Sequence, residues 1–186
     1  MSTVKRLLQP FVDEIIRPDY TSLYAQEAFD YIKPIMKSWL QRTDWLHDDF
    51  FQCKSDEEKI FKLHQDENDG LMIVAISWGC DFSPIPHNHN AWAIAGVAHG
   101  IEKHVFYKRE KQGEKVMLKE IGTRDYLSGD IVCMKDDVIH SVANVTENDG
   151  VAVSLHVYEK NLDNIERSQF DLENHVELPY KLDYVI

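Results

Sequence analysis

The spacing of apolar side chains divides the chain into a helical first part and a strand-rich second part. Over residues 7–16 apolar side chains recur every three or four positions, which predicts an amphipathic helix that ends before Pro18. A second helical pattern covers residues 23–39 and contains Pro34, which we expect to kink or divide that helix. The acidic stretch 44–59 is only weakly patterned, so we expect a connection with at most a short helix.

From residue 60 onward, short apolar runs separated by turn residues replace the helical spacing. The run LMIVAISW at residues 71–78 lies between two glycines and is rich in β-branched side chains, which predicts a buried strand. Further candidate strands are 91–98, 102–108, 115–121, 131–134, 138–145 and 151–158. Many short strands without intervening helices favour an antiparallel sandwich or barrel. We therefore expect one mainly β domain, with a helical segment (1–59) before a barrel and a tail that packs back on it (60–186).

Composition and charge exclude several classes of protein. A formal net charge of -12 and a pI of about 5.1 would repel a phosphate backbone, so nucleic acid is not an expected partner. No apolar run approaches the ~18 residues of a membrane helix. The first residues, MSTVKRLLQPFVDEII, show no signal-peptide pattern, so the expected compartment is the cytoplasm. An odd number of cysteines without CxxC spacing does not indicate a disulfide framework: Cys53, Cys80 and Cys133.

The histidines supply the candidate chemistry. His87 and His89 form a His-x-His pair in PIPHNHNAW, and residues two apart on a strand project to the same face. Two such imidazoles can bind one metal ion, although nine histidines in 186 residues also fall two apart by chance. For five others, which stand alone in polar or turn-like surroundings, a surface or hydrogen-bonded structural role is expected: His47, His64, His99, His104 and His175.

Two stretches resemble the motifs of cupins, small β-barrels of the jelly-roll type. The residues in register with the two motifs are His87, His89, Gly100, Gly129, His140 and Asn144. The departures are Asp81, Ala93, Lys135 and Asp137, which stand where cupins have glycine, glutamate, proline and glycine. The resemblance implies a cupin barrel in which His87, His89 and His140 hold a metal ion.

The loss of the cupin glutamate at Ala93 affects the expected metal chemistry. Three neutral nitrogens leave the metal its full dipositive charge and several open positions, which favours an anionic, chelating substrate with room for O2. Zinc is also compatible with three histidines and would give a hydrolytic or hydrating enzyme. The ligands alone do not decide between iron and zinc.

A later strand, residues 153–158, alternates polar and apolar side chains, so that Ser154, His156 and Tyr158 share one face. Without the metal motifs this pattern is typical of a half-polar sheet. Beside a metal pocket it predicts a hydrogen-bond chain in which Ser154 orients His156 and His156 orients the Tyr158 hydroxyl toward the substrate. No oxyanion glycine motif accompanies Ser154, so a serine nucleophile is not expected.

Taken with the glutamate-less cupin motifs, this Ser-x-His-x-Tyr strand is similar to the thiol dioxygenases of the cysteine dioxygenase family. The resemblance covers residues 71–170 and implies that Fe(II) and O2 convert a small thiol to its sulfinate. It also implies that His87, His89 and His140 are the iron ligands. Animal members carry a cysteine at the position of Ala93, cross-linked to the tyrosine that matches Tyr158, and no such cross-link is possible here.

The expected carboxylate clamp for the substrate is Arg167. Animal members use an arginine before the first barrel strand, where this chain has Phe61, Lys62 and Leu63. The bacterial 3-mercaptopropionate dioxygenases use an arginine after the tyrosine, and Arg167 lies at that offset. The expected substrate is therefore 3-mercaptopropionate or L-cysteine, and a guanidinium suits its carboxylate. The alternatives are a surface arginine that pairs with an acidic neighbour and, for the cation, Lys62.

Two other function classes stay open. One is a non-catalytic cupin that binds a small ligand, and the other is a zinc or nickel cupin whose chemistry needs no O2. For the two tryptophans near the motifs, Trp78 is expected in the core and Trp92 at the pocket. The oligomeric state does not follow from the sequence.

Overall fold

The computed structural model describes residues 2–17, 24–67, 70–82, 85–112, 115–148 and 150–185. Its helices come first in the chain: α1 (Thr3–Ile15), α2 (Ala25–Leu40) and the short α3 (Asp48–Phe51). The strands are β1 (Glu58–Gln65), β2 (Met72–Trp78), β3 (His87–Asn88), β4 (Ala93–His99), β5 (Ile101–Gln112), β6 (Lys115–Leu127), β7 (Ile131–Met134), β8 (Ile139–Asn144), β9 (Ala152–Tyr158), β10 (Ser168–Asp171), β11 (Val176–Pro179) and β12 (Tyr184–Val185). No helix in this described part of the chain is both long and apolar enough to cross a membrane.

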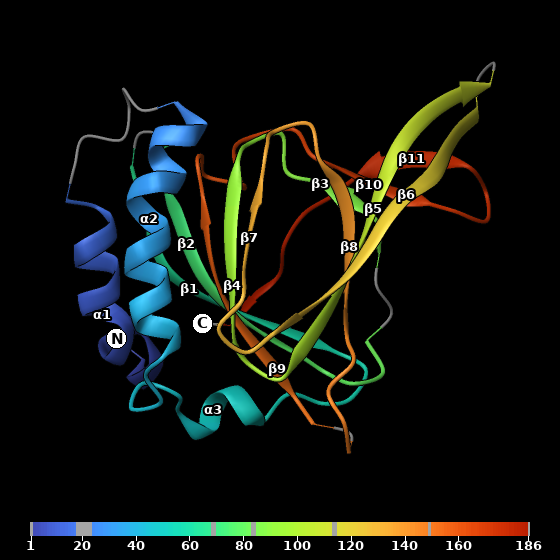
Figure 1. The fold of residues 1–186 in the computed structure, drawn as a ribbon. Helices are drawn as coiled ribbons and strands as arrows, with labels where there is room; N and C mark the ends of the chain where they lie inside the picture. Colours follow the sequence, from blue (N-terminus) through green and yellow to red (C-terminus); the bar gives the residue numbers. More distant parts are fainter. Residues whose placement is uncertain are drawn as a thin grey trace.

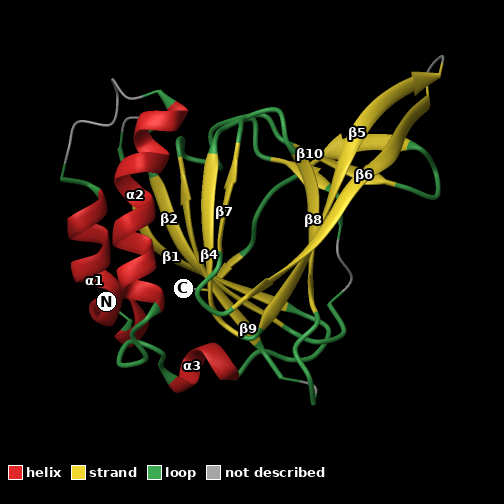
Figure 2. Ribbon diagram, viewed as in Figure 1, coloured by secondary structure: helices red, strands yellow, loops and turns green. Residues whose placement is uncertain are grey.

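The strands form two six-stranded sheets, in the orders β12-β1-β2-β9-β4-β7 and β11-β10-β3-β8-β5-β6. Strands far apart in sequence are neighbours, since β2 pairs with β9 and β3 pairs with β8, both antiparallel. These two sheets make the walls of a barrel (Figure 1). The architecture is the jelly-roll, or double-stranded β-helix, of the cupin fold, as predicted. Strands β5 and β6 continue past the barrel as a two-stranded arm (Figure 2).

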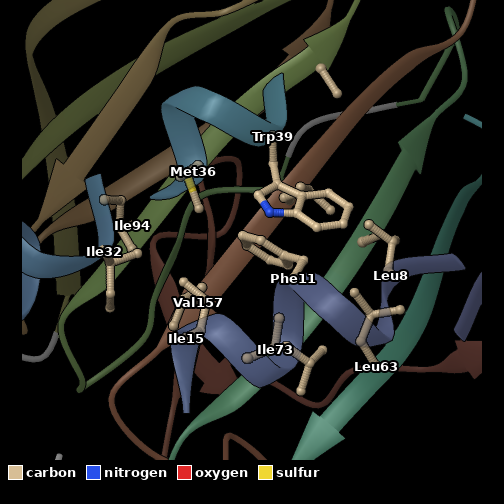
Figure 3. Close-up of a cluster of buried hydrophobic side chains, with 14 of the residues drawn as sticks. Leu8, Phe11, Ile15, Ile32, Met36, Trp39, Leu63, Ile73, Ile94 and Val157 are labelled. Atoms are coloured by element: carbon tan, nitrogen blue, oxygen red, sulfur yellow. The ribbon is translucent and has the colours of Figure 1, made fainter. Parts of the chain in front are cut away.

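Helices α1 and α2 cover the outer face of the first sheet (Figure 1). Strand β2 is buried on both faces, which explains why all its residues except Ser77 are apolar. Ile73 and Ala75 face the helices, whereas Met72, Val74 and Ile76 face the barrel interior. Figure 3 shows the helix-side cluster, in which the rings of Phe11 and Trp39 lie 5.6 Å apart.

Close packing of α2 on β4 depends on Gly96. A Cβ at this position would lie 2.7 Å from the Leu40 Cδ1 and 2.7 Å from the Met36 Sδ, too close for a real contact. The same helix runs without a break through Pro34, so the prediction that this residue divides it is wrong. Pro18, the expected end of the first helix, lies outside the described residues.

Most expected strands are confirmed, but several elements were not foreseen. Strand β1 starts at Glu58 inside the stretch expected to be a connection. Only Ile60 and Leu63 of this strand are fully buried, and they are three residues apart, so its sequence shows no strand alternation. The tail does pack back on the barrel, where β12 runs parallel to β1. The prediction for Trp92 is wrong, since its ring lies 5.6 Å from Phe29 in the helix–sheet core rather than at the pocket.

Candidate metal centre

Three histidine rings converge inside the barrel. His87 on β3 pairs directly with His140 on β8, and His89 follows in the turn after β3. The His89 Nε2 lies 3.2 Å from the His87 Nε2 and 3.4 Å from the His140 Nε2. Their candidate ligand atoms all lie within 4.8 Å of one another. His89 and His140 are 3% and 1% exposed, and His87 is partly exposed, so one side of the centre is accessible.

The ring nitrogens present lone pairs to a common point. The His87 Nδ1 donates to the carbonyl of Ile85 at 2.9 Å, which leaves its Nε2 unprotonated. Burial lowers the pKa of His87 to about 4 and lowers the pKa of His89 and His140 well below 6.5, so all three rings are neutral. Two ring nitrogens this close, 3.2 Å apart, need either a proton or a metal ion between them.

The spacing of the rings fits a divalent metal ion. Ligand nitrogens at about 2.1 Å from a metal lie about 3.0 Å apart in octahedral and about 3.4 Å apart in tetrahedral geometry. The Nε2–Nε2 separations of 3.2 and 3.4 Å fall within this range. Imidazole suits iron, zinc, copper and nickel. No acidic side chain of the described residues joins this ligand group.

On the opposite wall, β9 carries a continuous chain of hydrogen bonds. The Ser154 Oγ lies 2.8 Å from the His156 Nε2, and the His156 Nδ1 lies 3.1 Å from the Tyr158 hydroxyl. Trp78, expected only as a core residue, donates from its Nε1 to the Ser154 Oγ at 3.1 Å. The far end reaches the metal centre, where the rings of Tyr158 and His89 are 5.0 Å apart.

Burial keeps this chain uncharged. It lowers the pKa of His156 to about 4 and raises the pKa of Tyr158 above its ordinary value of 10, so the imidazole and the phenol are both neutral near pH 7. A neutral phenol at this position can donate its proton in a hydrogen bond into the pocket. Ala93 on β4 is the direct cross-strand neighbour of Tyr158, and its methyl group leaves the tyrosine without a covalent partner there.

Arg167 is buried near the same centre. Only 4% of it is exposed, so the alternative of a surface arginine is wrong. Its Nε donates to the carbonyl of Leu162 at 3.1 Å, whereas its Nη1 is buried with no hydrogen-bond partner among the described residues. The guanidinium lies 4.9 Å from the ring centre of Tyr180, and that ring lies 4.9 Å from His87. A buried cation with an unused donor is suited to an anionic ligand.

The HNHN sequence ties Arg167 to the histidines. Asn88 accepts from the backbone N–H of Ser168 at 2.8 Å, and Asn90 donates to the carbonyl of Glu166 at 2.6 Å. The residues on both sides of Arg167 are therefore held by asparagines that alternate with the two ligand histidines. Asn90 has a φ of 49°, a left-handed conformation that asparagine tolerates better than most residues.

Sequence reasoning missed three residues at this end of the barrel. Tyr180 comes from the tail, and a cavity of about 560 Å³ opens beside it and Arg167. Burial and the nearby Asp183 raise the pKa of Glu58 to about 7. Burial also raises the pKa of Tyr158 and Tyr180, and the charge of Glu58 adds to this shift. His104, for which a surface or hydrogen-bonded structural role was expected, is fully buried next to His140, and its place beside the metal centre was not foreseen.

The alternative cation Lys62 has other partners. Its Nζ lies 2.7 Å from the Asp163 carboxylate and 3.9 Å from the ring centre of Tyr184. Asn144, which matches a cupin motif, has a structural role, because its side chain donates to the carbonyls of Trp78 and Gly150. Neither residue touches the histidine centre in these contacts.

No family model matches this chain. Among solved structures it is similar to an RmlC-like cupin protein from Methanocaldococcus jannaschii (15% identity, TM-score 0.42), over 60% of this chain and 88% of that one. An RmlC-like cupin protein from Ralstonia eutropha matches 66% of this chain and 65% of its own, with 12% identity and a TM-score of 0.42. Oxalate oxidase in complex with glycolate matches 59% of this chain and 53% of its own, with 15% identity and a TM-score of 0.41. Such distant similarity carries no information on the reaction.

Proposed function

We propose that this chain is an Fe(II)- and O2-dependent dioxygenase that converts a small thiol carboxylate, 3-mercaptopropionate or L-cysteine, to its sulfinate. In the reaction RSH + O2 → RSO2H, sulfur loses four electrons and both oxygen atoms become bound to it, so no further reductant is needed. Iron, when bound by His87, His89 and His140, supplies a site where thiolate and O2 meet. The proposal joins the thiol dioxygenase resemblance of the sequence to the geometry of the site.

The observation that carries the proposal is the buried guanidinium of Arg167 beside an all-histidine centre. Three neutral ligands leave a bound dication uncompensated, which favours an anionic thiolate. The unused Nη1 of Arg167 supplies a donor for the carboxylate at the other end of the same small molecule. A thiol carboxylate satisfies both groups at once, whereas a simple thiol satisfies only the first.

The β9 chain controls protons on the remaining side of the pocket. Tyr158 is a neutral phenol 5.0 Å, ring to ring, from His89, so its hydroxyl can donate toward oxygen atoms near the centre. His156 holds that hydroxyl at 3.1 Å, and Ser154 with Trp78 holds His156. The residues thus position one proton at the Tyr158 hydroxyl.

The protein is first loaded with Fe(II) under anaerobic conditions. Its steady-state O2 consumption is then measured in air-saturated buffer. The substrates are 3-mercaptopropionate, L-cysteine and ethanethiol, with sulfinate measured by NMR. We expect one O2 consumed per sulfinate formed for the thiol carboxylates and much weaker activity with ethanethiol. If stoichiometrically loaded protein consumes no O2 with any thiol, the proposal is wrong. Protein that cannot bind metal at all would point to the non-catalytic alternative, and O2-independent turnover by zinc-loaded protein to the hydrolytic one.

A further inference from the structure

A second buried polar chain lies beside the metal centre and starts at Glu102, next to Ser154 and His156 of the β9 chain. Glu102 and His104 are two residues apart on β5, and neither has any exposed surface. The His104 Nε2 lies 3.3 Å from the Glu102 Oε2, and the His104 Nδ1 lies 3.4 Å from the His140 Nδ1. The chain therefore runs from a carboxylate through two imidazoles to a ring nitrogen that faces the metal centre.

The proton positions in this chain follow from the ligand role of His140. Its Nε2 faces His89 and must be unprotonated to bind a metal ion, so its Nδ1 carries the proton. That proton needs an acceptor, and the only atom that faces it in the described hydrogen bonds is the His104 Nδ1. His104 is then protonated on Nε2 and donates to Glu102. Each donor along the chain meets one acceptor.

The surroundings of Glu102 favour its charged form. Burial raises the pKa of this carboxyl group. The hydrogen bond and charge interaction with His104, with contributions from His156 and Ser154, outweigh burial and lower the pKa overall, so Glu102 is ionised. A buried carboxylate is stabilised by a nearby positive charge. A metal ion held by the three histidines would supply such a charge at the other end of the chain.

We propose that Glu102, acting through His104, is a positioning residue that orients His140 for metal binding and offsets the charge of the bound ion. The inference rests on the metal site but not on thiol chemistry. The centre then has an anionic group, Glu102, connected to the metal ion through His104 and His140, although the direct ligands are all neutral. Partners of this kind typically contribute 10- to 100-fold in metal affinity.

The test compares Co(II) affinity, measured by chelator competition, in the full-length apo protein and its Glu102→Gln variant. Glu102→Gln keeps the shape of the side chain but removes its charge, and should weaken Co(II) binding about 10- to 100-fold and change the ligand-field spectrum of bound Co(II). The control is Glu120→Gln, an equal change of charge on the exposed part of β6, which should bind Co(II) like the unchanged protein. Unchanged affinity and spectrum in a folded Glu102→Gln protein would overturn the proposal.

A second variant tests the same chain independently, in case Glu102→Gln does not fold. His104→Phe breaks the chain and keeps a ring between Tyr126 and Phe106, which pack on His104 at 4.9 and 6.2 Å. We expect it to weaken Co(II) binding as much as Glu102→Gln does, and the double variant to be no weaker than either single variant, because both remove one chain. Additive losses in the double variant would overturn the proposal. A negative thiol assay with these affinity changes intact would refute the proposed reaction and leave this inference standing.

Discussion

Replacing Arg167 by glutamine should reduce catalysis strongly and change stability little. In the proposed complex the guanidinium makes two charge-assisted hydrogen bonds to the substrate carboxylate, each with a net value of about 1.5–3 kcal/mol. Glutamine retains a weaker, neutral hydrogen bond, so the expected loss is about 3–4 kcal/mol. This corresponds to a fall in kcat/KM of roughly 10²- to 10³-fold for 3-mercaptopropionate.

The expected effect on folding is small because gains and losses offset each other. Glutamine loses the Nε hydrogen bond to Leu162, about 1 kcal/mol, and the contact of the cation with the Tyr180 ring, about 1 kcal/mol. It also removes a buried, charged N–H group without a partner, whose desolvation costs about 1–3 kcal/mol. The free energy of unfolding should therefore stay within about 1 kcal/mol of its original value.

The measurements are urea unfolding of the metal-free protein and steady-state kinetics with 3-mercaptopropionate and ethanethiol. The large loss should appear only for the thiol that carries a carboxylate. Arg109→Gln is the control, since Arg109 pairs with Glu177 on the partly exposed outer side of the sheet and should leave both kinetic values unchanged. An equal loss for both thiols, or a fall in stability above about 2 kcal/mol, would show that Arg167 has a structural role and would refute the clamp.

Three further predictions concern stability. Glu58 has a pKa of about 7 in the folded protein, above its ordinary 4.5, so its contribution to stability is full below about pH 4.5 and is lost as the pH rises through 7. The free energy of unfolding in urea should therefore decline by about 2 kcal/mol between pH 5 and 8, and Glu58→Gln should remove this decline. Gly96→Ala should cost about 1–3 kcal/mol, because the new methyl group would lie 2.7 Å from side chains of α2, while Gly122→Ala, with no atom within 4 Å, should cost almost nothing. Co(II) at 100 times its Kd should stabilise the protein by about 2.7 kcal/mol, and chelator or His140→Ala should abolish that gain; a stabilisation that survives His140→Ala would place the metal elsewhere.

The barrel could be predicted from the sequence to the extent that its strands are locally patterned. The run that forms β2 is buried on both faces and is therefore apolar except at Ser77, which makes it recognisable. Strand β3, with two residues, has no pattern of its own and exists because β8 and β10 pair with it. Strands β10 and β12 belong to the tail and pair with the distant strands β3 and β1, which leaves no local signal.

The site could be predicted where residues two apart on one strand do the chemistry. Such spacing identified the histidine pair at His87 and the trio ending at Tyr158, and the structure shows both sets facing the barrel interior. Glu102 and His104 have the same spacing, but charged and polar residues on a strand usually face solvent, so the pattern alone favours a surface. Tyr180 could not be found in this way because the tail brings it to His87 across more than ninety residues of sequence.

The alternation of histidine and asparagine in HNHN has a consequence for substrate choice. The histidines point to the metal centre, while Asn88 and Asn90 hold the backbone on both sides of Arg167. Since a stretch of four residues carries both sets of contacts, these hydrogen bonds hold the backbone around Arg167 in place relative to the two histidines. In the proposed reaction the sulfur binds at the metal centre and the carboxylate at Arg167. The protein would thus select thiol carboxylates by the number of bonds between these groups, through a backbone of fixed length rather than through the shape of a flexible pocket.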